Sequence, residues 1–440
     1  MTLFRKKFLA VCLLLFACLF QAVEGVSAER VLRLVPSPGV MDYSEEITRK
    51  LQELRDNGGG TLLIAPGRYP ILQGVVLAQG TKAVTLTLRG EKDARGRVPV
   101  LFDTDINRDP HHFFLFEGEA LSPSLALSFF DLEIRGNNIP RNPASANTPF
   151  VLDEGQTDLE PNLNLPRNQS YGHPFFFRGD IYSAAIRAKN VKSLHVEGVV
   201  IRNLFGNGIV VANYGNKHWE RIHRVQNVTI KNCKLDNVWQ WHQYDNTGDA
   251  IMLWNVADGV IENNEIVNDL AHTRWVGRCG IVLETNTEGI VVKNNVISGY
   301  ARNIHIELTF GGHQIIDNKL LASDIGITLN EPDGATRTPE VLNTTRPVTI
   351  EGNTFHYSQE RERYGVHSFG GPRSFISIST PRSAALDGSR LVNNKFTYKT
   401  HKGVRLNPWR AYDISHKTRH IYVQNSFLLN NWVEEKNTFR

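Results

Sequence analysis

Short segments with apolar residues at both ends recur along most of this chain. Six of them share a six-residue pattern in which the fourth position is usually asparagine, and they begin at Ile230, Ile261, Val292, Ile315, Ile350 and Leu391. An earlier segment, which begins at Val196, fits with the asparagine replaced. The fourth position returns after 34, 31, 31, 23, 35 and 41 residues. Such a period predicts a β-solenoid in which each repeat forms one coil and the loops vary in length.

The fourth position of each repeat is expected to lie in a turn. Asparagine tolerates the left-handed backbone conformation that a sharp turn requires. Stacked coil upon coil, its side-chain amide can hydrogen-bond along a ladder. Cys233 stands in this column, and we interpret it as a buried space-filling residue rather than a reactive thiol.

A second set of strands precedes these repeats and carries one central isoleucine per coil. Alternation of side chains along a strand predicts that these isoleucines point inward and form one stacked column. The column comprises Ile186, Ile209, Ile251, Ile281, Ile304 and Ile327.

The N-terminal part of the repeat region has helical rather than strand periodicity. A helix over about 43–57 would carry Ile47, Leu51 and Leu54 on one face, with Ser44 as its N-cap. We expect it to cap the solenoid. The prediction is an all-β fold, a right-handed parallel β-helix, in one domain over 29–440 with a long loop insertion at about 135–180.

Residues 1–28 have the pattern of a removable export signal. Arg5, Lys6 and Lys7 supply the positive start, an apolar run follows, and Ala28 ends a cleavage site of small residues. The mature protein is therefore expected to be secreted or periplasmic, with no membrane association after cleavage. A retained N-terminal anchor is the alternative.

Removing the signal takes away three basic residues and one acidic residue, so the net charge falls from +4 to about +2. This near-neutral balance argues against nucleic acid as a partner. Histidines 272, 305 and 313 are too dispersed to predict a transition-metal site. No cofactor is expected.

The helix, the segment GGGTLLIAPGRY (58–69) and the asparagine coils together resemble the pectate lyase-like superfamily of parallel β-helices over residues 43–400. The resemblance implies a ligand groove along one sheet face, walled by turn loops, and activity on a polysaccharide substrate. Fold alone does not settle the reaction.

Several catalytic signatures of that superfamily are altered or missing. Residues 246–249 are similar to the NTD element of polygalacturonases, but Gly248 is inserted before Asp249. The paired aspartates and Gly-His-Gly of that family, the DPH element of alginate epimerases and the arginine signature of pectate lyases do not occur. The residue pattern of segment 248–255 is similar to that of β-helix proteins encoded in exopolysaccharide clusters and of phage depolymerases.

Candidate catalytic residues follow from the expected register. Glu284 and Glu307 should project side by side from adjacent coils, with His305 and Arg302 on the strand of Glu307. Asp249, two positions before an inward isoleucine, is expected one coil from Glu284. An outward glutamate is ordinarily only a solvated surface residue. Two stacked glutamates beside basic groups are harder to dismiss, because like charges opposite one another are unfavourable.

Two chemistries fit these residues. In a glycoside hydrolase one carboxyl protonates the leaving oxygen while the other acts as nucleophile or base. Glu284 with Glu307 would suit retention of configuration, and Asp249 with Glu307 would suit inversion. In a polysaccharide lyase or C5-epimerase, acidic groups or calcium neutralise a uronate carboxylate, and His305, Arg302 or Lys189 removes the adjacent proton. We favour hydrolysis, because the acid pair is clearer than the base.

Substrate contacts are expected from aromatic and basic residues near this face, because flat rings stack on sugars. The candidates are Arg187, Lys189, Trp239, Trp241, His242, Trp254, Trp275 and Arg278. Alternatively, the rings only pack the loops together. The chain could then be a non-catalytic polysaccharide-binding protein, or could serve an exopolysaccharide pathway.

Overall fold

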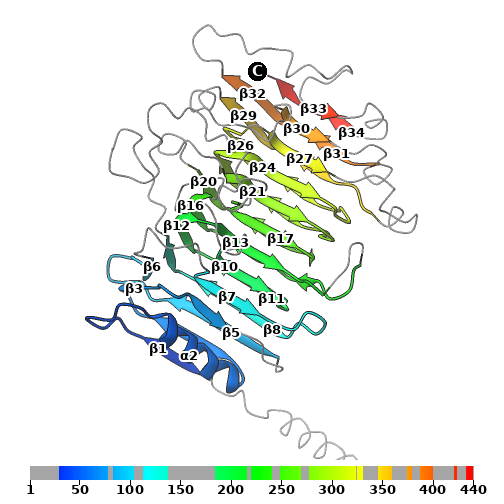
Figure 1. Ribbon diagram of the computed structural model, residues 1–440. Coiled ribbons are helices and arrows are strands. Elements are labelled where there is room, and N and C mark those ends of the chain that lie inside the picture. Colours follow the sequence, from blue (N-terminus) through cyan, green and yellow to red (C-terminus); the bar gives the residue numbers. More distant parts are fainter. Residues whose placement is uncertain are drawn as a thin grey trace, which may run out of the picture.

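The computed structural model describes residues 29–77, 83–103, 112–136, 184–215, 220–239, 248–268, 277–323, 325–330, 345–358, 374–378, 387–399, 421–423 and 433–439. In these residues the chain forms three long sheets in which every pair of neighbouring strands is parallel. The coils stack one upon another from the N-terminal to the C-terminal end (Figure 1). The predicted right-handed parallel β-helix is confirmed.

Each coil contributes one strand to each sheet. Sheet A is formed, in order, by β1 (Val31–Leu34), β2 (Gly60–Ile64), β5 (Val84–Gly90), β8 (Leu125–Phe130), β11 (Ser193–Glu197), β15 (Thr229–Lys231), β19 (Val260–Glu262), β22 (Val291–Lys293), β25 (Gln314–Ile316), β28 (Thr349–Glu351), β31 (Arg390–Val392) and β34 (Val433–Glu435). Sheet B is formed by β3 (Arg68–Pro70), β6 (Val100–Phe102), β9 (Glu133–Arg135), β12 (Val200–Phe205), β16 (Lys234–Trp239), β20 (Glu265–Val267), β23 (Val296–Ser298), β26 (Lys319–Leu321), β29 (Thr354–Ser358), β32 (Lys395–Lys399) and β35 (Thr438–Phe439).

Sheet C carries the candidate functional residues. Its strands are β4 (Val75–Leu77), β7 (Phe114–Glu117), β10 (Ala184–Lys189), β13 (Asn207–Ala212), β17 (Ile251–Trp254), β21 (Gly277–Glu284), β24 (Tyr300–Glu307), β27 (Ile325–Asn330), β30 (Ser374–Ile378) and β33 (Ile421–Val423). A short pair, β14 (Val225–Gln226) and β18 (Val256–Ala257), lies at the corner between sheets C and A. Residues 137–183, most of the predicted insertion, lie outside the described residues.

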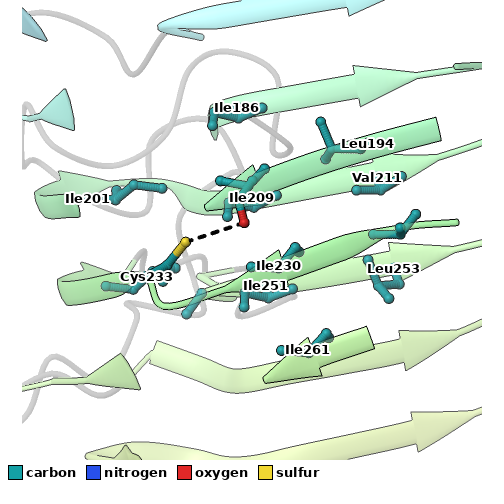
Figure 2. Close-up of a cluster of buried hydrophobic side chains, with 14 of the residues drawn as sticks. Ile186, Leu194, Ile201, Ile209, Val211, Ile230, Cys233, Ile251, Leu253 and Ile261 are labelled. Atoms are coloured by element: carbon teal, nitrogen blue, oxygen red, sulfur yellow. Dashed lines mark hydrogen bonds between the residues drawn. The ribbon is translucent and has the colours of Figure 1, made fainter. Parts of the chain in front are cut away.

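The isoleucine column is confirmed. Its six members are Cα partners from strand to strand, and all are fully buried in one continuous core. Figure 2 shows Ile186, Ile209 and Ile251 one above another on successive strands. Stacking like residues in this way buries apolar surface on every coil without a globular core.

The asparagine ladder is also present, in the turn from sheet A to sheet B. Asn264, Asn295, Asn318, Asn353 and Asn394 are buried, and each amide oxygen accepts hydrogen bonds from the asparagine or cysteine of the preceding coil. The ladder continues to Asn437, which the sequence patterns missed. The left-handed residue of the turn is the one before the ladder asparagine, as in Asn263 and Asn294. Our assignment of both roles to one position was wrong.

Cys233 takes the ladder position on its own coil. Its backbone N–H donates to Asn264, and its thiol lies 3.7 Å from the carbonyl oxygen of Val196 (Figure 2). Burial raises the pKa of this thiol to about 12. It is therefore a buried, unreactive group, as expected.

The predicted N-terminal helix is α2 (Ser44–Asp56). Ile47, Leu51 and Leu54 are buried in the core beside the first strands, and the helix lies at the β1 end of the stack (Figure 1). Ser44 is not its N-cap: Tyr43 holds that position, and the Ser44 hydroxyl donates to Asp42. Within the described residues no helix has the length and apolar character for crossing a bilayer.

Candidate functional site

Glu284 and Glu307 are the last residues of β21 and β24, and they are Cα partners on these neighbouring strands. The same row along sheet C continues to Trp254 on one side and to Asn330 on the other. The predicted register of the two glutamates is therefore the observed one. Parallel neighbours lie about 4.8 Å apart, so the two carboxylates belong to one local site.

Glu307 is held by two hydrogen-bond donors. His305 donates from Nε2 to Oε2 over 2.9 Å, and Asn330 donates from Nδ2 to Oε1 over 2.5 Å. Burial alone would raise the pKa of Glu307. The hydrogen bond from His305 and the positive charges of Arg278 and Arg302 outweigh it, and the pKa is lowered. Glu307 is therefore an ionised carboxylate at neutral pH.

His305 is 3% exposed. Burial lowers the pKa of His305 to about 4, and nearby Arg302 and Arg278 act in the same direction. The ring is thus neutral near pH 7. Because the ionised Glu307 can only accept, the proton of the neutral ring lies on Nε2.

Nδ1 of His305 and Oγ1 of Thr328 are buried, and neither has a hydrogen-bond partner in the described part of the chain. These residues are Cα partners on β24 and β27. Buried polar groups are nearly always bonded, and exceptions need a functional or structural reason. The two unsatisfied atoms belong to the residue that orients Glu307 and to its neighbour.

Asp249 lies one strand from Glu284, two residues before the start of β17. It is 1% exposed, and both of its carboxylate oxygens accept from Arg278, at 3.0 and 2.8 Å. Burial raises the pKa of Asp249, while the charges of Arg278 and Arg302 act against it. Nη2 of Arg278 is also 3.8 Å from Oε2 of Glu284, so one guanidinium connects the two acids.

Asp249 is on the outer side for a reason that we did not predict. Strict alternation would place it inside with Ile251, two residues later. Instead two consecutive residues, Ala250 and Ile251, both face the inner core, which breaks the alternation. On some other coils the residue at the position of Ala250 is a glycine. At one of these, Gly280, an added Cβ would lie 2.3 Å from Cγ2 of Ile297, so the position requires a small residue.

The outer face of sheet C is not open along its centre. Val210, Met252 and Val282 follow the inward isoleucines and are buried in a second apolar cluster, with Trp254 packed against it. Cys279 belongs to this cluster, and burial raises its pKa to about 12. The outward positions are thus covered rather than solvated, and the partly exposed acids lie at the strand ends.

Other predicted contacts lie further along the stack. Lys189 is three strands from Glu284 and forms an ion pair with Glu117 at 2.5 Å. Arg187 is hydrogen-bonded to His112, so neither residue reaches the acid pair. Between the two groups, the rings of Trp254 and Tyr214 lie 5.5 Å apart at 57°.

Four of the predicted aromatic contacts are not described at the level of side chains. The backbone of Trp239 ends β16 in sheet B, away from the strands of the acid pair. Trp241, His242 and Trp275 lie outside the described residues. Among the residues that are described, no group of three or more His, Cys, Asp or Glu side chains has the arrangement of a metal site.

No family model matches this sequence, and no curated protein is significantly similar to it. Solved structures resemble its fold at low identity. The tailspike protein of E. coli bacteriophage HK620, in complex with a pentasaccharide, has a TM-score of 0.48 and 12% identity over 92% of this chain and 64% of that one. The chain therefore spans about two thirds of the tailspike's length.

Two further structures are similar along almost their whole length. DFA-IIIase from Arthrobacter chlorophenolicus A6, in complex with DFA-III, has a TM-score of 0.45 and 11% identity over 93% of this chain and 98% of that one. The A-module of a mannuronan C-5 epimerase from Azotobacter vinelandii has a TM-score of 0.38 and 13% identity over 91% and 94%. At the level of fold, the parallel strand pairing makes the chain a parallel β-helix.

Proposed function

We propose that this protein cleaves glycosidic bonds of a polysaccharide, with Glu284 and Glu307 as the reacting carboxylates. The observation that supports this most is the difference between two acids on adjacent strands. Both oxygens of Glu307 accept hydrogen bonds, from His305 and Asn330, which stabilise its ionised form. The Arg278 guanidinium gives its two shorter contacts to Asp249 and lies 3.8 Å from Glu284, so in this proposal the proton of the pair is assigned to Glu284. Unequal surroundings of two close carboxyls allow one to remain ionised while the other carries a proton.

We assign the ionised role to Glu307. It would attack the anomeric carbon or activate a water, while Glu284 gives a proton to the leaving oxygen. The strand spacing of about 4.8 Å is close to the carboxyl separation of about 5–5.5 Å in retaining enzymes. Retention is therefore the favoured stereochemical outcome.

Asp249 takes a different part in this proposal. Both of its oxygens are bonded to Arg278 and the residue is nearly inaccessible, so it does not reach a sugar. Its role is to hold Arg278, which in turn faces Glu284. This favours the adjacent pair over an inverting pair made by Asp249 and Glu307.

The second candidate is a lyase or C5-epimerase acting on uronates. The supporting observation is His305, which is neutral and whose Nδ1 has no partner among the described residues, so it carries a free lone pair for proton abstraction. Its burial and its bond to Glu307 count against that role. If a lyase reaction required calcium, chelation would abolish it.

A glycan panel tests the proposal. Neutral and uronate polysaccharides are incubated with the protein in oxygen-18 water, and the products are analysed by mass spectrometry. Hydrolysis places the label in the new reducing end, whereas a lyase yields unsaturated ends that absorb ultraviolet light and carry no label. Products without label, or a sugar inverted at C5 in an uncleaved chain, would exclude the hydrolase assignment.

Export is part of the same proposal. Residues 1–28 would direct the protein to the compartment where extracellular polysaccharides occur, and would be removed during export. Terminal sequencing of the protein from culture supernatant or periplasm tests it, and a mature protein that starts at Met1 in the cytoplasm would contradict it.

A further inference from the structure

Three arginines meet one glutamate at the corner that follows the candidate acid pair. Glu288 lies four residues after Glu284, across the turn from sheet C toward sheet A. Its Oε2 accepts from Nε of Arg221 at 3.0 Å and from Nη1 of Arg224 at 2.7 Å, and its Oε1 lies 3.3 Å from Nε of Arg346. These groups form what we call the arginine corner.

The arginine corner is built by segments that are distant in sequence. Arg221 and Arg224 precede β14, and the guanidinium carbon of Arg221 lies 3.8 Å from the ring centroid of buried Phe310. The backbone of Arg346 pairs with Gly311. At Gly311 a Cβ would lie 1.9 Å from the carbonyl oxygen of Arg346, and φ is +69°, so this contact requires glycine.

Positive charge is concentrated in the arginine corner, because three guanidinium groups surround Glu288. Among the described residues a second carboxylate, that of Asp258, lies near Arg346: a Cβ on Gly289 would lie 2.9 Å from Oδ1 of Asp258 and 3.0 Å from Nη2 of Arg346. Glu288 is largely buried, whereas the side chain of Arg346 is 52% exposed and has its donors available to a ligand.

Arginine is suited to binding anions, because its planar fork of N–H groups matches a carboxylate or sulfate. Four residues of extended chain span at most about 14 Å, so the arginine corner lies within an oligosaccharide's length of Glu284. We infer that the arginine corner binds a negatively charged substituent of the glycan, which makes the substrate an acidic polysaccharide. This inference rests on the proposed function for the identity of the ligand as a glycan.

Binding of oligosaccharides to the full chain tests the inference, with Glu307→Gln introduced to prevent turnover. Calorimetry compares an oligouronate, the same oligosaccharide with its carboxylates reduced to alcohols, and a sulfated oligosaccharide of equal length. The charged ligands are expected to bind at least tenfold more tightly than the reduced one, and more weakly as salt is added. The better of the two charged ligands identifies the anionic group.

Arg346→Gln is expected to weaken binding of the charged ligand by roughly tenfold, as for loss of one hydrogen bond to a charged group. It should leave binding of the reduced ligand unchanged. Arg390→Gln, which removes an exposed arginine from sheet A, is the matched control and should have no effect. Arg346→Lys keeps the charge without the fork and should lose less than the glutamine variant.

Two results would overturn the inference. One is equal binding of charged ligand by the native and Arg346→Gln chains, with only the melting temperature lowered, because the arginines would then serve to hold the turn. The other is tighter binding of the reduced ligand than of the charged ones. Tighter binding of the reduced ligand would not contradict the proposed cleavage of glycosidic bonds. Charge-dependent binding without any cleavage would contradict only the proposed function.

Discussion

His305 and Glu307, two residues apart on β24, are joined by a hydrogen bond of 2.9 Å from a buried neutral imidazole to a carboxylate. The bond lowers the pKa of the Glu307 carboxyl, and this pKa would be higher in the same buried surroundings without this donor. His305 is therefore a positioning residue, which fixes the orientation and the ionisation of the group proposed to react.

Replacing His305 with phenylalanine should shift the pH dependence of activity. Without the donor the pKa of Glu307 rises, so a larger fraction of the enzyme is protonated and inactive at low pH. The acidic limb of kcat/KM against pH is expected to move to higher pH, with a smaller change at neutral pH.

The chain supplies a matched control for this variant. His195 donates to Glu197 at 3.0 Å, with the same spacing of two residues, on β11 of sheet A. His195→Phe should leave the activity profile unchanged. If both variants move the profile equally, or if His305→Phe moves it to lower pH, the positioning role is wrong.

The asparagine ladder should carry much of the stability of the turn between sheets A and B. Asn318 donates to the carbonyl of Val292 and to Asn353, and it accepts from Asn295. Asn318→Ala leaves buried backbone groups unsatisfied, and we expect it to lower the free energy of unfolding by about 3 kcal/mol in a urea titration.

Asn437→Ala is the comparison, because Asn437 ends the described ladder and is partly exposed. Water can replace its hydrogen bonds, so its cost should be well below that of Asn318→Ala. Equal losses at the two positions would show that the ladder's buried hydrogen bonds are not what stabilises the turn.

The broken alternation before the isoleucines should depend on small residues. Gly280→Ala would place a methyl group 2.3 Å from Cγ2 of Ile297 and 2.8 Å from the carbonyl oxygen of Asn303. We expect a loss of about 1–3 kcal/mol in unfolding free energy, together with reduced activity because Arg278 is displaced.

Gly259→Ala offers a milder contact, since its nearest neighbour is the flexible end of Ile290 at 3.1 Å. It should cost less stability and should leave activity intact. A Gly280→Ala protein with native stability and native activity would refute the steric argument.

The sequence predicted the parts of the fold that depend on local repetition. Each coil places one isoleucine at the same strand position, and this repetition gives the column from Ile186 to Ile327. The same constant spacing sets the register of Glu284 with Glu307. Packing against the identical residue of the next coil is a nearest-neighbour property, so periodicity is sufficient to find it.

The rest depends on contacts that no period encodes. Asp249 is outside only because Ala250 adds a second inward position, and its partner Arg278 was expected to bind substrate. The outer positions Met252 and Val282 are covered, which strand parity cannot show. The arginine corner joins segments from three coils, and no spacing in the sequence links Arg224 to Arg346.

The most direct test of the account is the activity of the single acid variants on a polysaccharide that the native protein cleaves. Glu284→Gln and Glu307→Gln should each reduce kcat by a factor of a thousand or more, about 4 kcal/mol of transition-state stabilisation, with a melting temperature close to native. Glu351→Gln, on β28 of sheet A, is the control and should keep full activity. Native turnover in either of the first two variants would contradict the carboxylate pair.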